Sequence, residues 1–276
     1  MKKLSVAGMA ALAASLAAPA MAADVDLPPA VFKGPPPIVH VFNWTGCYVG
    51  GQLGGGFMKD SEVDSHDDPI FHGGGAIAGG QAGCNYQAQQ FVVGVEGEGW
   101  WSGLKNKSTF NQTTTFTGGD IIDPSTGTET ATNFTETKNR WDAAVSLRAG
   151  YAVDRLLFYG KAGVVWGGFN FFGSQSDLRT FNGVFDSSQA NSFSENKTLT
   201  GMLLGFGVEW AFLDNWLLRF EADYLNFPRT DVPFTASGFQ TCCGIGATTN
   251  TQTSSGVISE FASKGLLKVG VSYKFY

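Results

Sequence analysis

The chain has 276 residues, of which 15% are charged and 13% aromatic, with 37 glycines and a formal net charge of −6. A soluble domain usually carries about 25% charged residues, so this composition argues against an ordinary soluble surface. The negative charge argues against nucleic acid as a partner, and the excess of glycine and aromatic residues is typical of strands rather than of a helical core.

The first 22 residues predict a secretory signal peptide. Lys2 and Lys3 precede an apolar run from Leu4 to Ala18, and Pro19-Ala20-Met21-Ala22 supplies an A-x-A cleavage site. A membrane anchor is the alternative reading, but the run is short and rich in alanine. Cleavage after Ala22 would export the mature protein and change the formal net charge from −6 to −8, because both lysines are lost.

Residues 23–42 predict a periplasmic tether that precedes the main domain, residues 43–276. The stretch DVDLPPAVFKGPPPIVHVF, residues 24–42, contains five prolines in nineteen residues, a composition typical of an extended and semi-rigid linker. The main domain contains no apolar run of 18 residues, so no transmembrane helix is predicted there.

Within residues 43–276, successive segments alternate between apolar and polar side chains with a period of two, which indicates strands. Two glycine-rich segments, at about 43–57 and 76–86, alternate less clearly. In the last segment, Lys268, Gly270 and Ser272 lie on the opposite parity from a row of large apolar residues. That row consists of Leu267, Val269, Val271, Tyr273 and Phe275. Eight strands are predicted in all, at about 43–57, 76–86, 91–104, 138–152, 156–170, 196–212, 216–227 and 262–276.

Short and long connections alternate strictly between these strands, and the long ones lie at about 58–75, 105–137, 171–195 and 228–261. This pattern predicts an all-β fold, an eight-stranded antiparallel up-and-down transmembrane β-barrel with short periplasmic turns and four long extracellular loops. A soluble secreted barrel or sandwich is the alternative. Aromatic residues near the predicted strand ends favour the membrane barrel, because such residues form girdles at both interfaces. They are Trp44, Tyr86, Phe91, Tyr151, Phe158 and Trp216 near the short turns, and Phe57, Trp101, Trp141, Trp166 and Tyr224 near the loops.

The parity opposite to the apolar one carries charges of both signs, which are expected to face the lumen. Buried charges need partners, and an eight-stranded barrel has room for its own side chains or for one small ligand. A polar network that fills the lumen is therefore favoured over an open pore. Its predicted members are Glu96, Glu98, Asp142, Arg148, Lys161, Glu209, Arg219, Glu221, Asp223 and Lys268.

Three stretches carry a family resemblance: NWTGCYVGGQLGGGF at 43–57, GGQAGCNYQ at 79–87 and the terminal KVGVSYKFY. They resemble the porin-like small outer-membrane β-barrel proteins of Gram-negative bacteria, the immunogenic outer-membrane protein type, whose barrel is similar to the transmembrane domain of outer membrane protein A. The resemblance implies a place in the cell outer membrane. It also implies a C-terminal signal for the β-barrel assembly machinery, formed by Lys268, Gly270, Tyr273 and Phe275, although the additional Tyr276 departs from relatives that end on Phe.

Four cysteines in an exported chain suggest disulfides. Cys47 and Cys84 fall at similar heights near the periplasmic rim with the same outward parity, so either a cross-strand disulfide or two lipid-facing thiols is expected; many relatives are expected to carry an aromatic or aliphatic residue there. Cys242 and Cys243 are adjacent in the last long loop, where a vicinal bridge, pairing with another chain and metal binding all remain open.

No catalytic, metal-binding or cofactor site is predicted. His66 and His72 lie beside Asp64, Asp67 and Asp68, but a solvated acidic loop explains this cluster better than a metal or hydrolase site does. The same acidic loop is hypothesised to bind divalent cations that bridge lipopolysaccharide phosphates.

The function expected from these features is that of a structural, surface-located outer-membrane barrel that supports envelope integrity, with at most small-pore activity and no enzymatic activity. The expected partners are outer-membrane lipid, lipopolysaccharide and the assembly machinery. A haem-binding or other small-ligand surface protein is the alternative that the resemblance permits, and a lipid-modifying barrel enzyme is third.

Overall fold

The computed structural model describes residues 42–60, 73–118, 125–181, 184–242 and 248–275. These residues form one antiparallel sheet, in which nine strands are described. None of them belongs to a helix that could cross a membrane. The predicted signal peptide and all of the predicted tether except Phe42 lie outside the described residues.

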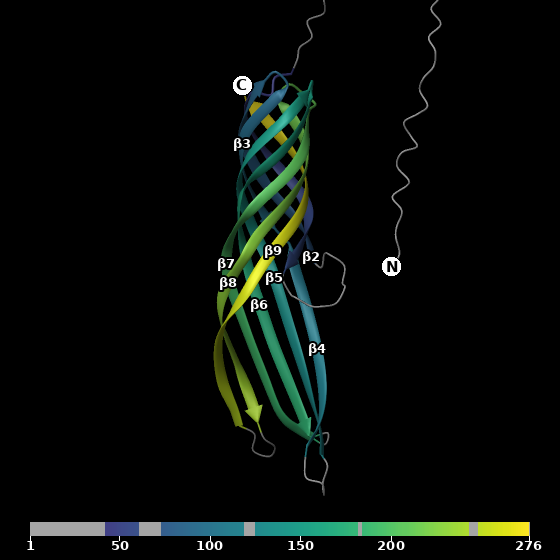
Figure 1. Cartoon of the computed structure of the whole chain (residues 1–276), viewed down its shortest axis with the longest axis vertical. Helices are drawn as coiled ribbons and strands as arrows, with labels where there is room; N and C mark the ends of the chain where they lie inside the picture. Colours follow the sequence, from purple (N-terminus) through teal and green to yellow (C-terminus); the bar gives the residue numbers. More distant parts are fainter. Residues whose placement is uncertain (1–41, 61–72, 119–124, 182–183, 243–247, 276) are drawn as a thin grey trace, which may run out of the picture. The chain divides into compact units, whose positions relative to one another are not determined.

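Eight strands close into a ring, as the sequence predicts (Figure 1). β1 pairs with β2 on one side and with β9 on the other, so every strand of the ring has two neighbours. The ring runs through β1 (Gly46–Asp60), β2 (Gly73–Ala88), β3 (Phe91–Ser102), β5 (Ser125–Val153), β6 (Leu156–Phe181), β7 (Val184–Ala211), β8 (Trp216–Cys242) and β9 (Thr248–Phe275).

The ninth strand, β4 (Lys105–Gly118), pairs with β5 beyond the end of β3. It lies in a region expected to be a long loop, and β5 to β9 also continue far into the predicted loops. These extensions are rich in threonine, whose β-branched side chain favours strands. Cross-strand hydroxyl pairs such as Thr128–Thr180, with 3.0 Å between the two oxygens, add to the backbone ladder.

The outer surface of the ring is apolar, and the side chains predicted to form aromatic girdles are exposed on it, with one exception. Trp44 is completely buried, and its Nε1 donates a hydrogen bond to the backbone oxygen of Asp154 at 3.3 Å. The prediction for Trp44 was wrong because this residue precedes β1, where alternation along the strand no longer decides which way a side chain points. Trp44 instead packs against Phe42 inside the end of the barrel, with ring centroids 4.9 Å apart.

The interior of the barrel consists of a charged layer between two apolar layers. Along β8, the inward positions run from Leu217 through three charged residues to Leu225 and Phe227. Leu217 belongs to the apolar cluster near the short turns, which also contains Trp44, whereas Leu225 belongs to a larger cluster toward the long hairpins. The three charged residues between these leucines are Arg219, Glu221 and Asp223.

Candidate functional site

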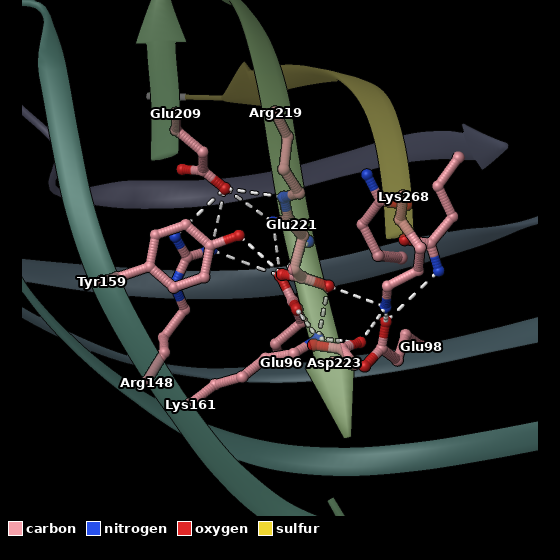
Figure 2. Close-up of polar contacts among 12 residues, drawn as sticks. Glu96, Glu98, Arg148, Tyr159, Lys161, Glu209, Arg219, Glu221, Asp223 and Lys268 are labelled. Carbon is pink, nitrogen blue, oxygen red and sulfur yellow. Dashed lines mark hydrogen bonds and ion pairs between the residues drawn. The ribbon is translucent and has the colours of Figure 1, made fainter. Parts of the chain in front are cut away.

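All ten charged residues predicted to face the lumen are buried inside the ring. Their exposed fractions do not exceed 6%, the value for Glu98. Nine of them form one network in the middle layer, shown in Figure 2, whereas Asp142 lies in a separate ion pair. The nine come from β3, β5, β6, β7, β8 and β9, so the network joins strands from most of the circumference.

The first half of the network contains two arginines that share two glutamates. Arg148 Nη2 lies 3.0 Å from Glu209 Oε1, and its Nη1 lies 3.3 Å from Glu96 Oε2. Arg219 donates from Nε to Glu209 Oε1 at 2.8 Å and from Nη2 to Glu96 Oε2 at 2.5 Å. Tyr48 Oη donates to Glu96 Oε2 and accepts a 2.6 Å hydrogen bond from Arg148. Each glutamate therefore binds both guanidinium groups.

The second half contains two lysines among three carboxylates. Lys161 Nζ lies 2.6 Å from Glu98 and 2.7 Å from Glu221. Lys268 Nζ lies 2.7 Å from both of these glutamates and 2.5 Å from Asp223. The three carboxylates converge closely enough to be considered as metal ligands. However, the two ammonium groups already lie among them, so the donor set fits an ion-pair cluster better than a metal site.

Two longer contacts connect the halves: Lys161 Nζ lies 3.5 Å from Glu96, and Arg219 Nη1 lies 3.7 Å from Glu221. Tyr159 also connects the two halves of the network. Its hydroxyl donates to Glu221 at 2.6 Å, and its ring lies 3.9 Å from the guanidinium carbon of Arg148. The cluster is therefore a single network of buried side chains at the centre of the barrel.

Glycine makes room for these long side chains. Gly205 on β7 lies between Lys161 on β6 and Asp223 on β8 in the cross-strand register. A Cβ at Gly205 would overlap Asp223 Oδ1 and would lie 3.0 Å from Lys161 Cε. The glycines on the lumen parity thus provide the space into which the charged side chains extend.

The sequence analysis missed several polar members of the interior, among them Tyr48, Tyr159 and Lys264. Tyr159 shares the parity of Lys161, two residues further along β6, so the signal was present in the alternation. Tyrosine was instead associated with the lipid-facing girdle. Lys264 Nζ lies 2.6 Å from Asp142 and 4.5 Å from the ring centroid of Phe169. This ion pair lies within the apolar cluster toward the long hairpins.

Cys47 and Cys84 are direct cross-strand partners of β1 and β2, and a disulfide joins them. Of the residues predicted to form an assembly signal, Lys268 points into the lumen, whereas Tyr273 and Phe275 are exposed on the outer surface. Gly270 pairs with Gln52 of β1. Cys243 and the acidic histidine-containing segment lie outside the described residues, as does the side chain of Cys242.

Comparison with known proteins shows similarity over almost the whole chain. The family model described as outer membrane protein beta-barrel domain matches residues 9–275. The 31 kDa outer-membrane immunogenic protein of Brucella melitensis is 33% identical over 239 residues, which cover 81% of this chain and 88% of the relative. The 22 kDa outer membrane protein of Rhizobium leguminosarum bv. viciae is 27% identical and covers 74% of each chain.

Among solved structures, the outer membrane protein OprG of Pseudomonas aeruginosa is similar with 12% identity and a TM-score of 0.36, over 85% of this chain and 98% of that one. The match of the family model and the identity to the Brucella protein establish the family independently of this likeness. With its closed ring, apolar exterior and charged interior, the chain belongs to the outer membrane protein beta-barrel domain family and is a β-barrel of the bacterial outer membrane.

Proposed function

We propose that this protein is a structural barrel of the outer membrane, which supports the envelope and displays its long hairpins at the cell surface without forming a large pore. The observation that carries the proposal is the filled interior. Two apolar layers enclose the charged network, and the network residues Glu96, Lys161 and Arg219 are 0%, 4% and 1% exposed. A water-filled channel would leave such charges hydrated.

The arrangement also supports a mechanical role. Each charge of the network binds partners on other strands, so separation of two strands would leave buried charges without counterions. Breaking one partner of a buried ion pair costs about 3–5 kcal/mol. Ion pairs across the lumen therefore hold the strands together in addition to the backbone hydrogen bonds between neighbouring strands.

Planar-bilayer recording tests the filled lumen. The purified protein is expected to produce no conductance steps of the size of general porins, and a variant with Trp44→Ala and Leu217→Ala serves as the comparison because it removes bulk from one apolar layer. Large steps from the natural protein would refute the proposal.

The envelope role is tested by deletion of the gene, which is expected to sensitise cells to detergent, and by restoration of resistance with the natural gene.

The haem-binding and enzymatic alternatives find no specific support among the described residues. Haemin titration distinguishes the first alternative, since a saturable spectral change would favour a ligand-binding protein. The carboxylates of the lumen are engaged by lysines and arginines, which does not suit them to act as general acids or bases on a substrate.

We also propose that β9 serves as the signal for the assembly machinery. Tyr273 and Phe275 present their rings on the outer face of the strand, where a protein that guides the strand into the membrane could contact them. β9 is also the strand that closes the ring against β1. Removal of residues 273–276 is expected to leave the protein exported but unassembled, and normal heat-modifiable barrel in the outer membrane would contradict this.

A further inference from the structure

A row of residues crosses the outer face of the barrel at the level where β3 ends. Phe57 of β1 pairs with Gly74 of β2, Gly74 pairs with Lys105 of β4, and Lys105 pairs with Lys138 of β5. Neighbouring strands lie about 4.8 Å apart, so these four residues form a short lateral row. Two lysines stand side by side at one end of it.

Both lysines point away from the lumen. The residues that flank Lys105, Leu104 and Asn106, are buried at 0% and 9% exposure. The residues that flank Lys138, Thr137 and Asn139, are likewise buried, at 6% and 2%. Because side chains alternate between the two faces of a strand, the lysines occupy the outer face.

Further cations surround this pair, and among the side chains that the structure describes they meet little negative charge. Lys59, Lys107 and Arg140 each lie two residues from a member of this row, namely Phe57, Lys105 and Lys138, and all three are exposed. Among the described side chains, the carboxylate that pairs with this group is that of Glu136, which lies 3.2 Å from Lys107 and 2.6 Å from Lys138. We use the name cationic row for the five basic residues Lys59, Lys105, Lys107, Lys138 and Arg140, two of which, Lys105 and Lys138, belong to the lateral row described above.

Like charges directly opposite each other on neighbouring strands destabilise a sheet. Lys105 and Lys138 have this arrangement. The single carboxylate of Glu136, which pairs with Lys107 and Lys138, neutralises one positive charge only. The cationic row therefore gains stability from a bound anion, which would relieve the repulsion that the strand register imposes.

The position of the row indicates where that anion comes from. Trp101 and Trp141 are cross-strand partners on the outer face and are 62% and 43% exposed, as expected for an aromatic girdle at the membrane interface. Lys138 lies three residues beyond Trp141, which is about 10 Å along the strand. Lys59 lies two residues beyond Phe57, which is about 7 Å. The cations thus lie level with Phe57 or beyond the paired tryptophans, where lipid headgroups are expected.

We propose that the cationic row binds the phosphate groups of lipopolysaccharide in the outer leaflet. The aromatic girdle would hold the apolar part of the same lipid against the barrel, and the lysines would reach its phosphates. Lysine and arginine near an anionic membrane surface each contribute about a fivefold gain in binding. This site is separate from the filled lumen, so the proposal stands independently of the proposed structural function.

The experiment compares lipopolysaccharide binding by purified, folded, full-length mature protein in detergent, measured by isothermal titration calorimetry. Replacement of Lys59, Lys105 and Lys138 by Gln is expected to weaken binding about 100-fold. The corresponding triple Arg variant is expected to retain it. The single variant Lys105→Gln is expected to lose about fivefold. Its matched control is Arg179→Gln, an exposed cation on β6 roughly 40 Å along the strand from Trp166.

Dephosphorylated lipopolysaccharide provides the second arm, and it is expected to bind the natural protein as weakly as lipopolysaccharide binds the triple Gln variant. Heat modifiability on gels shows whether each variant is folded. Equal binding of the phosphorylated and dephosphorylated forms would overturn the proposal, as would equal effects of Lys105→Gln and Arg179→Gln. A soluble sulfated polysaccharide that bound the row as tightly as the glycolipid would also overturn it.

The acidic residues Asp64, Asp67 and Asp68, which lie outside the described residues, are tested as an alternative source of the anion. Their replacement by Asn is expected to leave glycolipid binding unchanged within twofold. A tenfold increase would show that this segment already neutralises the cationic row, and would count against a lipid as its natural partner.

Discussion

Arg219 lies directly opposite Glu209 on the neighbouring strand, and its Nε donates a 2.8 Å hydrogen bond to Glu209 Oε1 inside the barrel. The same guanidinium group also binds Glu96. We expect Arg219→Ala to lower the free energy of unfolding by about 3–5 kcal/mol, because two buried carboxylates lose a counterion. Urea-induced unfolding in lipid vesicles measures the loss.

The control for this variant is Arg155→Ala near a short turn. Arg155 pairs with Asp214 at 2.9 Å, but their side chains are 37% and 77% exposed. Exposed pairs contribute about 0–1 kcal/mol. Equal losses from the two variants would show that burial of the network does not stabilise the barrel.

A substitution at Gly205 tests whether the charged network needs the space that this glycine leaves. We expect Gly205→Ala to reduce stability by about 1–3 kcal/mol, since the added methyl group would overlap Asp223 and crowd Lys161. Gly160→Ala is the matched control on the outer face of β6, where a Cβ would lie 3.8 Å from the nearest atom, the backbone oxygen of Gly205. Comparable midpoints of thermal unfolding for the two variants would contradict the prediction.

The disulfide predicts a response to reductant. Cys47 and Cys84 are separated by 37 positions, and a crosslink of this span stabilises a protein by about 2–4 kcal/mol. We expect reductant to lower the urea midpoint of the natural protein while the ring remains folded. The Cys47→Ala, Cys84→Ala double variant should start at the lower midpoint and no longer respond. A continued response would assign the effect to Cys242 and Cys243 instead.

The charge of Glu136 is expected to affect both the stability of the hairpin and the binding of lipopolysaccharide by the cationic row. The hydrogen bond from Lys138 lowers the pKa of Glu136, so its carboxylate is charged at neutral pH. Its contribution to stability is present above the pKa of the unfolded chain and is lost as the pH falls through the lowered pKa of the folded state. Glu136→Gln should strengthen lipopolysaccharide binding about fivefold at neutral pH.

The control for Glu136→Gln is Glu129→Gln, which removes an exposed charge further along β5. It is expected to leave glycolipid binding unchanged. Weaker binding by the Glu136 variant would mean that this carboxylate organises the lysines rather than neutralising them.

The barrel could be predicted from the sequence because six of the eight spanning strands clearly obey a period of two and every second connection is short. The same parity placed Glu96, Arg148 and Lys268 in the lumen. It did not indicate which charges pair, since the pairing depends on register between strands far apart in the sequence. Tyr159 was missed because an aromatic residue suits both faces of a membrane barrel, although it shares the inward parity of Lys161 and its hydroxyl group binds Glu221.

The extracellular strands could not be predicted because they lack an apolar face. A polar, threonine-rich segment such as 105–118 has the composition of a loop, and alternation cannot be recognised where both faces meet water. Its order depends on the neighbouring strand, which already leaves the membrane in the correct direction and supplies a backbone ladder from Lys105 to Gly118. This information is not local in the sequence.

The register of the hairpins above the membrane determines what an antibody could recognise there. In one cross-strand row, Thr113 of β4 lies beside Thr130 of β5, which lies beside Leu178 of β6. A paratope resting on this wall would contact one residue from each of several strands, about 4.8 Å apart, rather than consecutive residues of one segment. Epitopes on these hairpins would therefore be conformational, and short synthetic peptides from the same segments would be poor substitutes for the folded surface.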